Sequence, residues 1–383
     1  MTSPRVTLAV ALVGLSAAWS AGNVGPVVSE IADEFSVSLA VVGILAGTLF
    51  LGSLLVGLPF APRIGQRLGL ERGLRLGCGA LVIGNLLFAV TPAFAGLVLG
   101  RILPGLAFAV ASTLGVVWAQ QAGGVRLVGI FGAALQLGIA LALLTGSGLA
   151  DLGVDWRVGF VISAALGVAS YVAIPGGQRS EHSAEPRSKG FLNAAWRHAR
   201  VYRLALLFVS IYGVPMILSA WLIEFLSREG DVAASVAGVV AFVLFGLSAG
   251  IRVLGAQLEQ RGVPYVFLVG SLTAAALGMA LLAFEPVEAG AFAAVVLIAL
   301  GFGIPYTTAL TEAQALHPAA PGEPVALMTF AALVPPVVTI PIVGHAIARG
   351  EGDVALLVIA VFLLLATLAN LRRTGIPLRE AAK

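Results

Sequence analysis

LVGIFGAALQLGIALALLTGSGLA, residues 127–150, is the stretch that decides the fold class of this chain. These 24 consecutive residues contain no Asp, Glu, Lys or Arg. A helix needs about 20 apolar residues to cross roughly 30 Å of hydrocarbon. In lipid, a helix satisfies its own backbone hydrogen bonds, whereas an open strand leaves them unpaired. The stretch therefore predicts a transmembrane helix.

The rest of the chain repeats this pattern. Cutting the sequence at every Asp, Glu, Lys and Arg leaves eleven more stretches of at least 18 residues: 6–29, 35–62, 76–100, 102–125, 158–178, 204–223, 232–251, 262–284, 289–311, 324–348 and 354–371. We therefore predict an all-α integral membrane protein with twelve transmembrane helices. A cleaved signal peptide is the alternative for the first stretch, but 24 uncharged residues exceed the usual core of about 7–15.

Composition excludes the main soluble classes. Of the 383 residues, 59% are hydrophobic and 11% are charged, and mean hydropathy is +1.02. A soluble domain carries about 25% charged residues, so soluble enzymes, nucleic-acid binders and disordered proteins are excluded. The net charge of +3 is spread along the chain and indicates no nucleic-acid partner. The single cysteine, Cys78, lies in an apolar run, and we expect a small buried hydrophobe there.

The basic residues predict the orientation. If the N-terminus is inside, the cytoplasmic side holds 18 basic residues: Arg5, Arg63, Arg67, Arg72, Arg75, Arg126, Arg179, Arg187, Lys189, Arg197, Arg200, Arg203, Arg252, Arg261, Arg372, Arg373, Arg379 and Lys383. The outer side then holds only 3, which are Arg157, Arg228 and Arg349. Cytoplasmic loops are enriched in Lys and Arg. We therefore expect a multi-pass protein of the cell (inner) membrane with both termini cytoplasmic.

One polar interruption divides the chain into two halves. Residues 176–203 carry six basic residues and separate two sets of six stretches. We predict a six-helix bundle at 1–175, a cytoplasmic linker at 176–203 with a surface helix at 191–201, a second six-helix bundle at 204–372, and a tail at 373–383. The linker is interpreted as a solvated tether, with a regulatory or lipid-binding role as the alternative.

Glycine–proline interruptions recur every third helix of this scheme. They are Gly25-Pro26, Pro104-Gly105, Gly213-Val-Pro215 and Gly303-Ile-Pro305. Proline inside a helix removes a backbone hydrogen bond and kinks the helix. Interrupted segments at corresponding positions of a repeat indicate a transporter's binding site. The alternative is that each kink serves packing alone.

Two loops carry related motifs. Residues 58–67 read LPFAPRIGQR and residues 255–262 read GAQLEQRG, and the fourth stretch is preceded by Arg101 of RILPG. These motifs and the twelve stretches resemble the major facilitator superfamily, whose loop signature is Gly-x-x-x-Asp-Arg-x-Gly-Arg-Arg. The matching positions are Arg63, Gly65 and Arg67 in the first copy and Gly255, Glu259 and Gly262 in the second. Pro62 replaces the acid of the first copy, and the fifth stretch lacks the Gly-Pro pair of antiporters.

The resemblance implies two pseudo-symmetric six-helix bundles and a gate formed by the loop motifs. An Arg and an acid at helix ends can bridge moving halves in one state and release in the other, which biases a two-state equilibrium. We assign the gate to Arg63, Gly65, Arg67, Gly255 and Glu259. The alternative is that the arginines only anchor the chain on the cytoplasmic side.

Arg101 is the most informative residue for a binding site. A charge at this depth costs on the order of 3 kcal/mol, and no Asp or Glu lies deep within a first-half span. Its partner is expected to be an outer acid, a carbonyl or amide oxygen such as that of Asn23, or an anionic ligand. Snorkelling to the surface is the alternative. With the polar residues beside the helix breaks, the predicted substrate cavity comprises Asn23, Arg101, Gln136, Tyr212, Tyr306 and Thr307.

These observations predict a secondary transporter of a small solute by alternating access, energised by protons, with a lean to a small organic anion or metabolite. The alternatives are a multidrug or metabolite exporter of the same superfamily, a non-transporting membrane sensor, and an integral membrane enzyme. We find no P-loop, catalytic constellation or metal-ligand spacing, so we expect no enzyme activity, cofactor or metal. The expected partners are the solute, membrane lipid and protons, and we expect a monomer.

Overall fold

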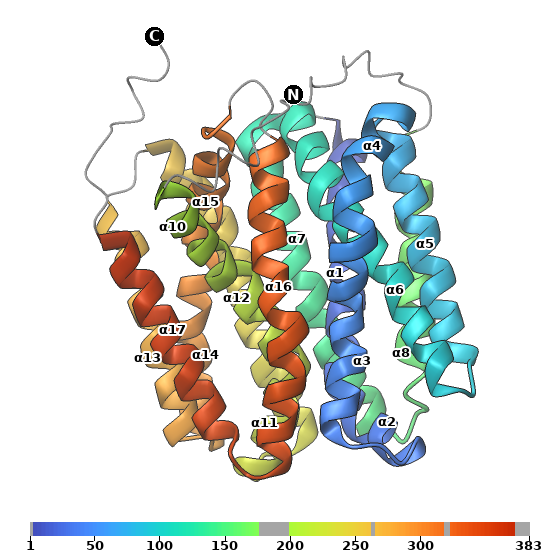
Figure 1. Ribbon diagram of the computed structural model, residues 1–383, viewed down its shortest axis with the longest axis vertical. Coiled ribbons are helices and arrows are strands. Elements are labelled where there is room, and N and C mark those ends of the chain that lie inside the picture. Colours follow the sequence, from blue (N-terminus) through green and yellow to red (C-terminus); the bar gives the residue numbers. More distant parts are fainter. Residues whose placement is uncertain (1–2, 176–198, 262–264, 318–321, 372–383) are drawn as a thin grey trace.

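The structure is a computed structural model that describes residues 3–175, 199–261, 265–317 and 322–371. The described part is helical and contains no strand. In Figure 1 the helices run side by side along the long axis of the molecule. We call the end where α1 begins and α17 ends the terminal end, and the opposite end, where α2 lies, the far end.

The first half contains eight α-helices and three short helices of other types. They are α1 (Pro4–Gly22), the 3₁₀ helix η1 (Gly25–Val27), α2 (Val28–Glu34), α3 (Leu39–Gly52), the π-helix η2 (Ser53–Gly57), α4 (Leu58–Leu68), α5 (Leu70–Val90), α6 (Phe94–Val110), the π-helix η3 (Ala111–Gly115), α7 (Val116–Asp151) and α8 (Val158–Ala173). Within α7 the chain breaks at Gly123 and Gly124. Gly124 has φ +61°, a left-handed conformation that favours glycine.

The second half repeats this design. Its described helices are α10 (Ala199–Phe208), the π-helix η4 (Val209–Gly213), α11 (Val214–Glu229), α12 (Ala234–Arg261), α13 (Tyr265–Phe284), α14 (Glu288–Gly303), α15 (Pro305–Gln314), α16 (Gly322–Ala348) and α17 (Gly352–Leu371). Helices pack mainly on helices of their own half, for example α1 on α7 and α13 on α14. Two bundles result, as the sequence predicts.

Nine helical segments of the described residues are long and apolar enough to cross a membrane, and a bent pair, Leu39–Leu55 with Phe60–Leu68, makes up to ten. Two further predicted spans remain. One falls within the continuous segment Phe94–Asp151, which contains the Gly123–Gly124 break, and the other is the shorter apolar helix Val158–Ala173. Their crossing of the membrane stays a prediction.

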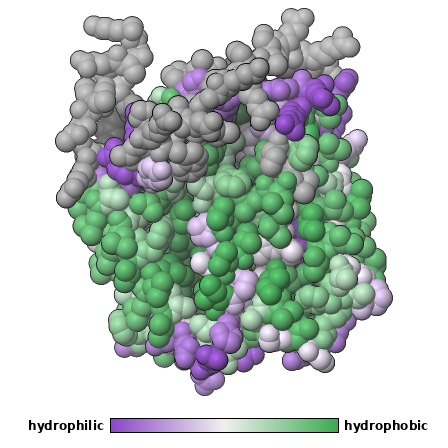
Figure 2. Space-filling view, viewed as in Figure 1, coloured by the Kyte–Doolittle hydropathy of each residue, from purple (hydrophilic) through white to green (hydrophobic). Residues whose placement is uncertain are grey.

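The surface of the described residues matches a bilayer. Figure 2 shows hydrophobic side chains around the middle of the molecule and hydrophilic ones at both ends. Exposed large apolar side chains include Ile83, Val172, Phe284 and Val358. Such a belt would aggregate in water and is stable against lipid tails. Cys78 is buried at 5% exposure, so the expectation of a small buried hydrophobe agrees with the structure.

Small residues bring the two bundles into contact. α7 packs on α12, and α3 packs on α16. Gly43 lies so close to α16 that an added Cβ would be 2.9 Å from the Cα of Pro341. One turn along, Gly47 lies against Val337. Close backbone approach through small residues is the usual way in which helices associate in lipid, where the hydrophobic effect between helices is absent.

Three of the four predicted prolines coincide with a change in helix geometry. Pro26 lies in the 3₁₀ helix η1, Pro215 follows the π-helix η4, and Pro305 begins α15 after a break at Ile304. Pro104 instead lies inside the continuous helix α6. Neighbouring helices can therefore absorb one proline without interrupting the segment.

The position of Arg252 differs from the one predicted from the sequence. The predicted eighth span ends at residue 251, which left Arg252 in a cytoplasmic loop. In the structure α12 continues to Arg261, and Arg252 is 2% exposed within it. The predicted span ended too early because it was cut at every charged residue, and the sequence does not distinguish a charged residue buried in a helix from one in a loop. Without Arg252, the predicted numbers of basic residues are 17 on the cytoplasmic side (18 minus 1) and 3 on the outer side.

Some predictions lie outside the described residues. The predicted tail and almost all of the linker at 176–203, including most of the expected surface helix at 191–201, belong to this group. α10 begins at Ala199, within the C-terminal end of the predicted linker. The exact boundaries of the predicted domains stay predictions.

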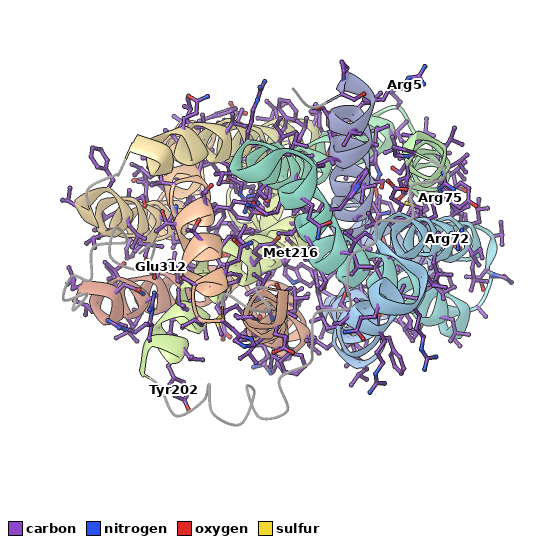
Figure 3. All side chains as sticks on the ribbon, turned by 90° about the horizontal axis from the view of Figure 1, so that it is seen from above. Arg5, Arg72, Arg75, Tyr202, Met216 and Glu312 are labelled. Carbon is purple, nitrogen blue, oxygen red and sulfur yellow. The ribbon has the colours of Figure 1, made fainter. Side chains whose placement is uncertain are left out.

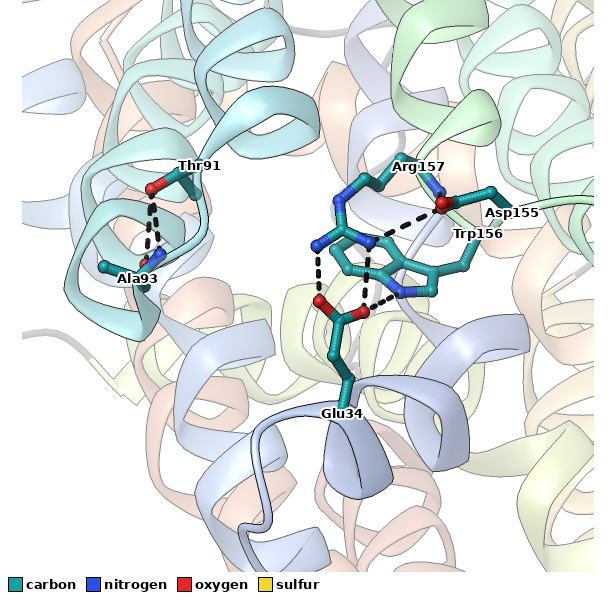
Figure 4. A network of polar contacts seen from close by, with 6 residues as sticks. All are labelled: Glu34, Thr91, Ala93, Asp155, Trp156 and Arg157. Carbon is teal, nitrogen blue, oxygen red and sulfur yellow. Dashed lines mark hydrogen bonds and ion pairs between the residues drawn. The ribbon is translucent and has the colours of Figure 1, made fainter.

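At the far end of the first half, a polar clamp ties the end of α2 to the segment that precedes α8 (Figure 4). Arg157 donates hydrogen bonds of 3.0 and 2.5 Å to the two oxygens of Glu34, and the indole of Trp156 donates one of 2.8 Å. Asp155 lies 3.6 Å from Arg157. The hydrogen bond to Glu34 raises the pKa of Arg157. The clamp fixes α2 against the start of α8 within one bundle.

Candidate functional site between the bundles

Arg252 lies between the two bundles. Its Nη1 donates 3.0 Å to the carbonyl of Gly132, which belongs to the first half. Its Nη2 donates a 3.1 Å hydrogen bond to the carbonyl of Ile211, and its Nε donates one of 3.3 Å to the carbonyl of Phe302. Both carbonyls belong to the second half. One guanidinium therefore contacts α7, η4 and α14 together with its own helix.

Pro215 explains why one of these carbonyls is available. In an α-helix the carbonyl of Ile211 would accept the N–H of the residue four positions later. That residue is Pro215, which has no N–H. The chain forms the π-helix η4 at this point, and the Ile211 carbonyl accepts a hydrogen bond from Arg252. The helix break thus supplies an acceptor to the site.

Two tyrosines cover the guanidinium. Arg252 Cζ lies 4.1 Å from the ring centroid of Tyr306 and 5.8 Å from that of Tyr212. The two rings are 6.0 Å apart. A cation over an aromatic face gains about 2 kcal/mol when desolvated. Gly132 makes room for this arrangement, since a Cβ at that position would overlap the Tyr306 ring.

Further polar groups lie around this cluster. One turn from the Gly132–Arg252 contact, Gln136 donates a 3.0 Å hydrogen bond to Ser248 across the same pair of helices. Thr307 follows Tyr306 on α15, and its buried hydroxyl has no partner among the described residues. Figure 3, seen from the terminal end, shows Met216, next to Pro215, near the centre of the molecule. The site is therefore central.

The positive charge of the Arg252 guanidinium is not balanced by a negative charge among its contacts in the described residues. Arg252 makes no ion pair among the described residues, and its three acceptors are neutral carbonyls. A guanidinium has five N–H groups, and three of them are used here. A buried charge without a partner costs several kcal/mol. Two N–H groups of the guanidinium therefore stay available as hydrogen-bond donors.

Arg101 forms a second, separate cluster inside the first half. It is 1% exposed, so it does not snorkel to the surface. Its Nη1 donates 2.7 Å to the Ser20 carbonyl and 3.0 Å to Oδ1 of Asn23. Asn23 in turn donates 3.3 Å to Asn85. The ring of Phe88 lies 5.9 Å from the guanidinium. These residues belong to α1, α5 and α6 and the segment that follows α1.

The structure therefore divides the predicted cavity residues into two groups. Gln136, Tyr212 and Tyr306 lie at the interface with Arg252, with Thr307 beside them. Asn23 and Arg101 lie together within the first bundle. Nε and Nη2 of Arg101 have no partner among the described residues. This second cluster carries a charge without forming part of the contact between the halves.

The predicted gating residues lie at the terminal end. Arg63 and Arg67 are exposed on α4 and make no ion pair among the described residues. Gly65 packs under Leu114, and Gly255 packs against the chain at Gly303 and Ile304. The backbone of Glu259 belongs to α12, but its side chain lies outside the described residues. The gate stays a prediction.

Arg252 was not among the site residues predicted from the sequence. A signal was present, because Arg252 lies nine residues before the end of α12 at Arg261, and inside an otherwise apolar segment that extends to Gly255. Only the next charge, Glu259, approaches the true end of the helix. Counting the turns between consecutive charges would have suggested a charge inside the helix.

Comparison with known families agrees with this architecture. The family model described as "Major Facilitator Superfamily" matches residues 10–339. The chain belongs to the Major Facilitator Superfamily. The match begins in α1 and ends in α16, so both bundles belong to it. The family resemblance based on the loop motifs is thereby confirmed.

Solved structures of superfamily members share the fold. The partially occluded, inward-open xylose transporter XylE from E. coli is 14% identical, with a TM-score of 0.76 over 97% of this chain and 97% of that chain. A D-xylose-proton symporter is 13% identical, with a TM-score of 0.77 over 97% of this chain and 98% of that chain. Similarity at this level of identity shows the fold alone.

One curated relative matches a shorter part of the chain. The uncharacterized transporter YycB of Bacillus subtilis (strain 168) is 41% identical over 92 residues. The match covers 24% of this chain and 22% of that protein's length. The chain thus matches about a fifth of the relative, and the similarity is regional.

Proposed function

We propose that this protein is a secondary transporter that carries a small anion by alternating access, with Arg252 as the anchor of the anion. The observation that carries this proposal is a buried guanidinium between the bundles with neutral partners only. Burial favours charged groups that are paired, and a ligand carboxylate supplies the missing charge. Guanidinium forms bidentate bonds with planar anions.

The position of Arg252 supports alternating access. Its contact with Gly132 joins the bundles, whereas its contacts with Ile211 and Phe302 stay within the second bundle. When the bundles move apart at one side, the Gly132 contact is the one that breaks. An anion can take the place of the Gly132 carbonyl and compensate for the lost bond. Substrate binding thereby lowers the free energy of the open state.

An anion explains the site better than a neutral sugar does. The two structural neighbours are named for transport of xylose, and xylose is an uncharged sugar. A neutral solute leaves the Arg252 charge uncompensated, at a cost of several kcal/mol. The small size of the site also favours a small solute, because Gly132 and Tyr306 are in direct contact.

We propose that protons supply the energy. Moving one negative charge into a compartment at −100 mV costs about 2.3 kcal/mol. Co-transport of a proton cancels this charge, and further protons drive uptake. One structural neighbour is named a proton symporter, which supports the same coupling here.

A ligand panel tests the proposed substrate class. We expect formate, lactate, nitrate or phosphate salts to raise the melting temperature of the detergent-purified protein, because a ligand that binds only the native state stabilises it by mass action. Xylose and choline are the neutral and cationic controls. The stabilising anion should then enter proteoliposomes along an imposed proton gradient. Stabilisation by xylose or choline alone, with no response to any anion, would contradict the proposal.

Topology is a separate prediction. We propose that the terminal end faces the cytoplasm, as the basic residues indicate. In a Cys78→Ala background, a cysteine at the exposed far-end position Glu351 should react with an impermeant maleimide in intact cells. A cysteine at the exposed position Arg72, in the first turn of α5 at the terminal end, should react only after permeabilisation. The reverse pattern would invert the orientation.

A further inference from the structure

The helix α11 carries two carboxylates near the far end, and they have different kinds of partner. Glu229 accepts hydrogen bonds of 2.8 and 3.1 Å from the backbone N–H groups of Gly352 and Asp353. It therefore stabilises the N-terminus of α17, where four N–H groups lack intrahelical partners. Both helices belong to the second bundle, so this contact does not change when the bundles move.

Glu224, about one turn earlier, joins the two bundles. The hydroxyl of Ser29 on α2 donates 2.9 and 3.1 Å to the two oxygens of Glu224. Arg228 on α11 forms an ion pair with the same carboxylate. Glu224 is 8% exposed, although it lies near the end of a span. A buried carboxylate with partners in both halves is a connection that movement must break.

The surroundings of Glu224 show that the far end is closed in this structure. Four residues before Ser29, Gly25 packs so tightly on α11 that an added Cβ would overlap the carbonyl of Ser219. The hydrogen bond from Ser29 thus lies at the end of a close backbone contact between η1, α2 and α11. Opening the far end separates α2 from α11 and exposes Glu224 to water.

The charges near Glu224 are unequal in number. On α2, Glu30 repels the Glu224 carboxylate electrostatically, and on α11 the pairing cation is Arg228. Of the helices packed against α11, α16 brings His345 and α17 brings Asp353 to the far end, while α12 has no charged residue before Arg252. Arg228 is thus paired with Glu224, and Glu30, from the other bundle, places a second negative charge beside that carboxylate.

We propose that Glu224 binds the coupling proton, and that its deprotonated form holds the far ends of the bundles together through Ser29. Protonation puts an O–H on one oxygen and removes the charge. The hydrogen bond from Ser29 then changes from charge-assisted to neutral, and the ion pair with Arg228 is lost. Charge-assisted bonds are roughly twice as strong as neutral ones. The equilibrium moves toward the state that is open at the far end. The coupling role rests on the proposed transport function.

Protons alone serve as the probe. In a Cys78→Ala background, spin labels at the exposed positions Ser38 and Ala233 report the distance between the bundles at the far end. We expect the distance distribution in lipid nanodiscs to shift to longer values when the pH falls from 8 to 5. Glu224→Gln should show the long distances at both pH values, because glutamine carries no charge.

Two variants make the test specific. Glu229→Gln changes a carboxylate on the same helix that contacts one bundle only, and it should keep the wild-type response to acid. Ser29→Ala removes the partner in the first bundle without touching Glu224, and it should lengthen the distance at pH 8. A pH-independent distance in the wild type, or a wild-type acid response in Glu224→Gln, would overturn the proposal. A shift caused by sodium at constant pH would identify a different coupling ion and overturn it also.

This test and the ligand panel fail independently. Neither the spin-label distances nor the acid response requires a bound anion. If no anion binds but the distances respond to pH through Glu224, the anion proposal fails and the proton site stands. If an anion binds but Glu224→Gln responds to acid like the wild type, transport of an anion stands and the proton site fails.

Discussion

Replacing Arg252 with glutamine should weaken anion binding by roughly 100-fold or more. A charge-assisted hydrogen bond contributes about 1.5–3 kcal/mol, and each 1.4 kcal/mol changes the dissociation constant about tenfold. Glutamine removes the charge and the bidentate geometry at once. Arg252→Lys keeps the charge but loses the planar fork, so it should bind with intermediate affinity. Titration of the stabilising anion by thermal shift or calorimetry measures both effects.

Arg101 provides the matched comparison, because it is equally buried and also lacks a carboxylate partner among the described residues. From the sequence, an anionic ligand was one of several expected partners of Arg101, whereas the contacts of Arg252 with both bundles favour Arg252 as the anion site. Arg101→Gln should lower thermal stability and leave the anion dissociation constant within about threefold of the wild type, well inside one tenfold step of 1.4 kcal/mol. If Arg101→Gln loses binding and Arg252→Gln keeps it, the anion binds inside the first bundle.

Gly25→Ala should open the far end. A Cβ at this position would overlap the Ser219 carbonyl of α11, and a backbone atom cannot move away as a side chain does. Overpacking of this kind costs typically 1–3 kcal/mol. A cost of about 2 kcal/mol, which applies only to the state closed at the far end, changes the ratio of the two states by roughly 30-fold. The Ser38–Ala233 spin-label distance at pH 8 should therefore lengthen.

Gly148→Ala is the control for this variant. Gly148 is also a glycine in a helix, α7, but an added Cβ there meets no atom within 4 Å. The change should leave the distance at the far end unaltered and can only improve helix propensity, by up to about 1 kcal/mol. Equal distances in Gly25→Ala and the wild type would mean that the η1–α11 contact does not limit closure.

The family, the two bundles and the membrane belt follow from patterns that are repeated many times along the chain. The apolar stretches, such as 127–150, each carry the same signal, so an error in one does not change the result. Asn23 as an oxygen partner of Arg101 could also be predicted, because a charge without a nearby acid leaves few alternatives. The prediction needs only the depths of Arg101 and Asn23 along their helices, and these can be counted in the sequence.

Arg252 could not be recognised in the same way. Its role depends on three carbonyls from residues 132, 211 and 302, which are far apart in the sequence. The Pro215 interruption was visible, but the sequence does not say which side chain uses the carbonyl that the proline leaves free. The same holds for Ser29 and Glu224, which are 195 residues apart.

The sequence by itself determined that the chain crosses a membrane as helices, because hydrocarbon tolerates few other backbone structures. It also determined the division into two halves, because the charged residues gather between them. Only the tertiary structure decided which buried charges face the interface between the bundles. Helix rotation and packing set that choice, and a hydrophobic segment in lipid has little sequence periodicity to reveal its rotation. Arg101 therefore lies inside one bundle and Arg252 lies between the two, although the sequence around each is an apolar segment.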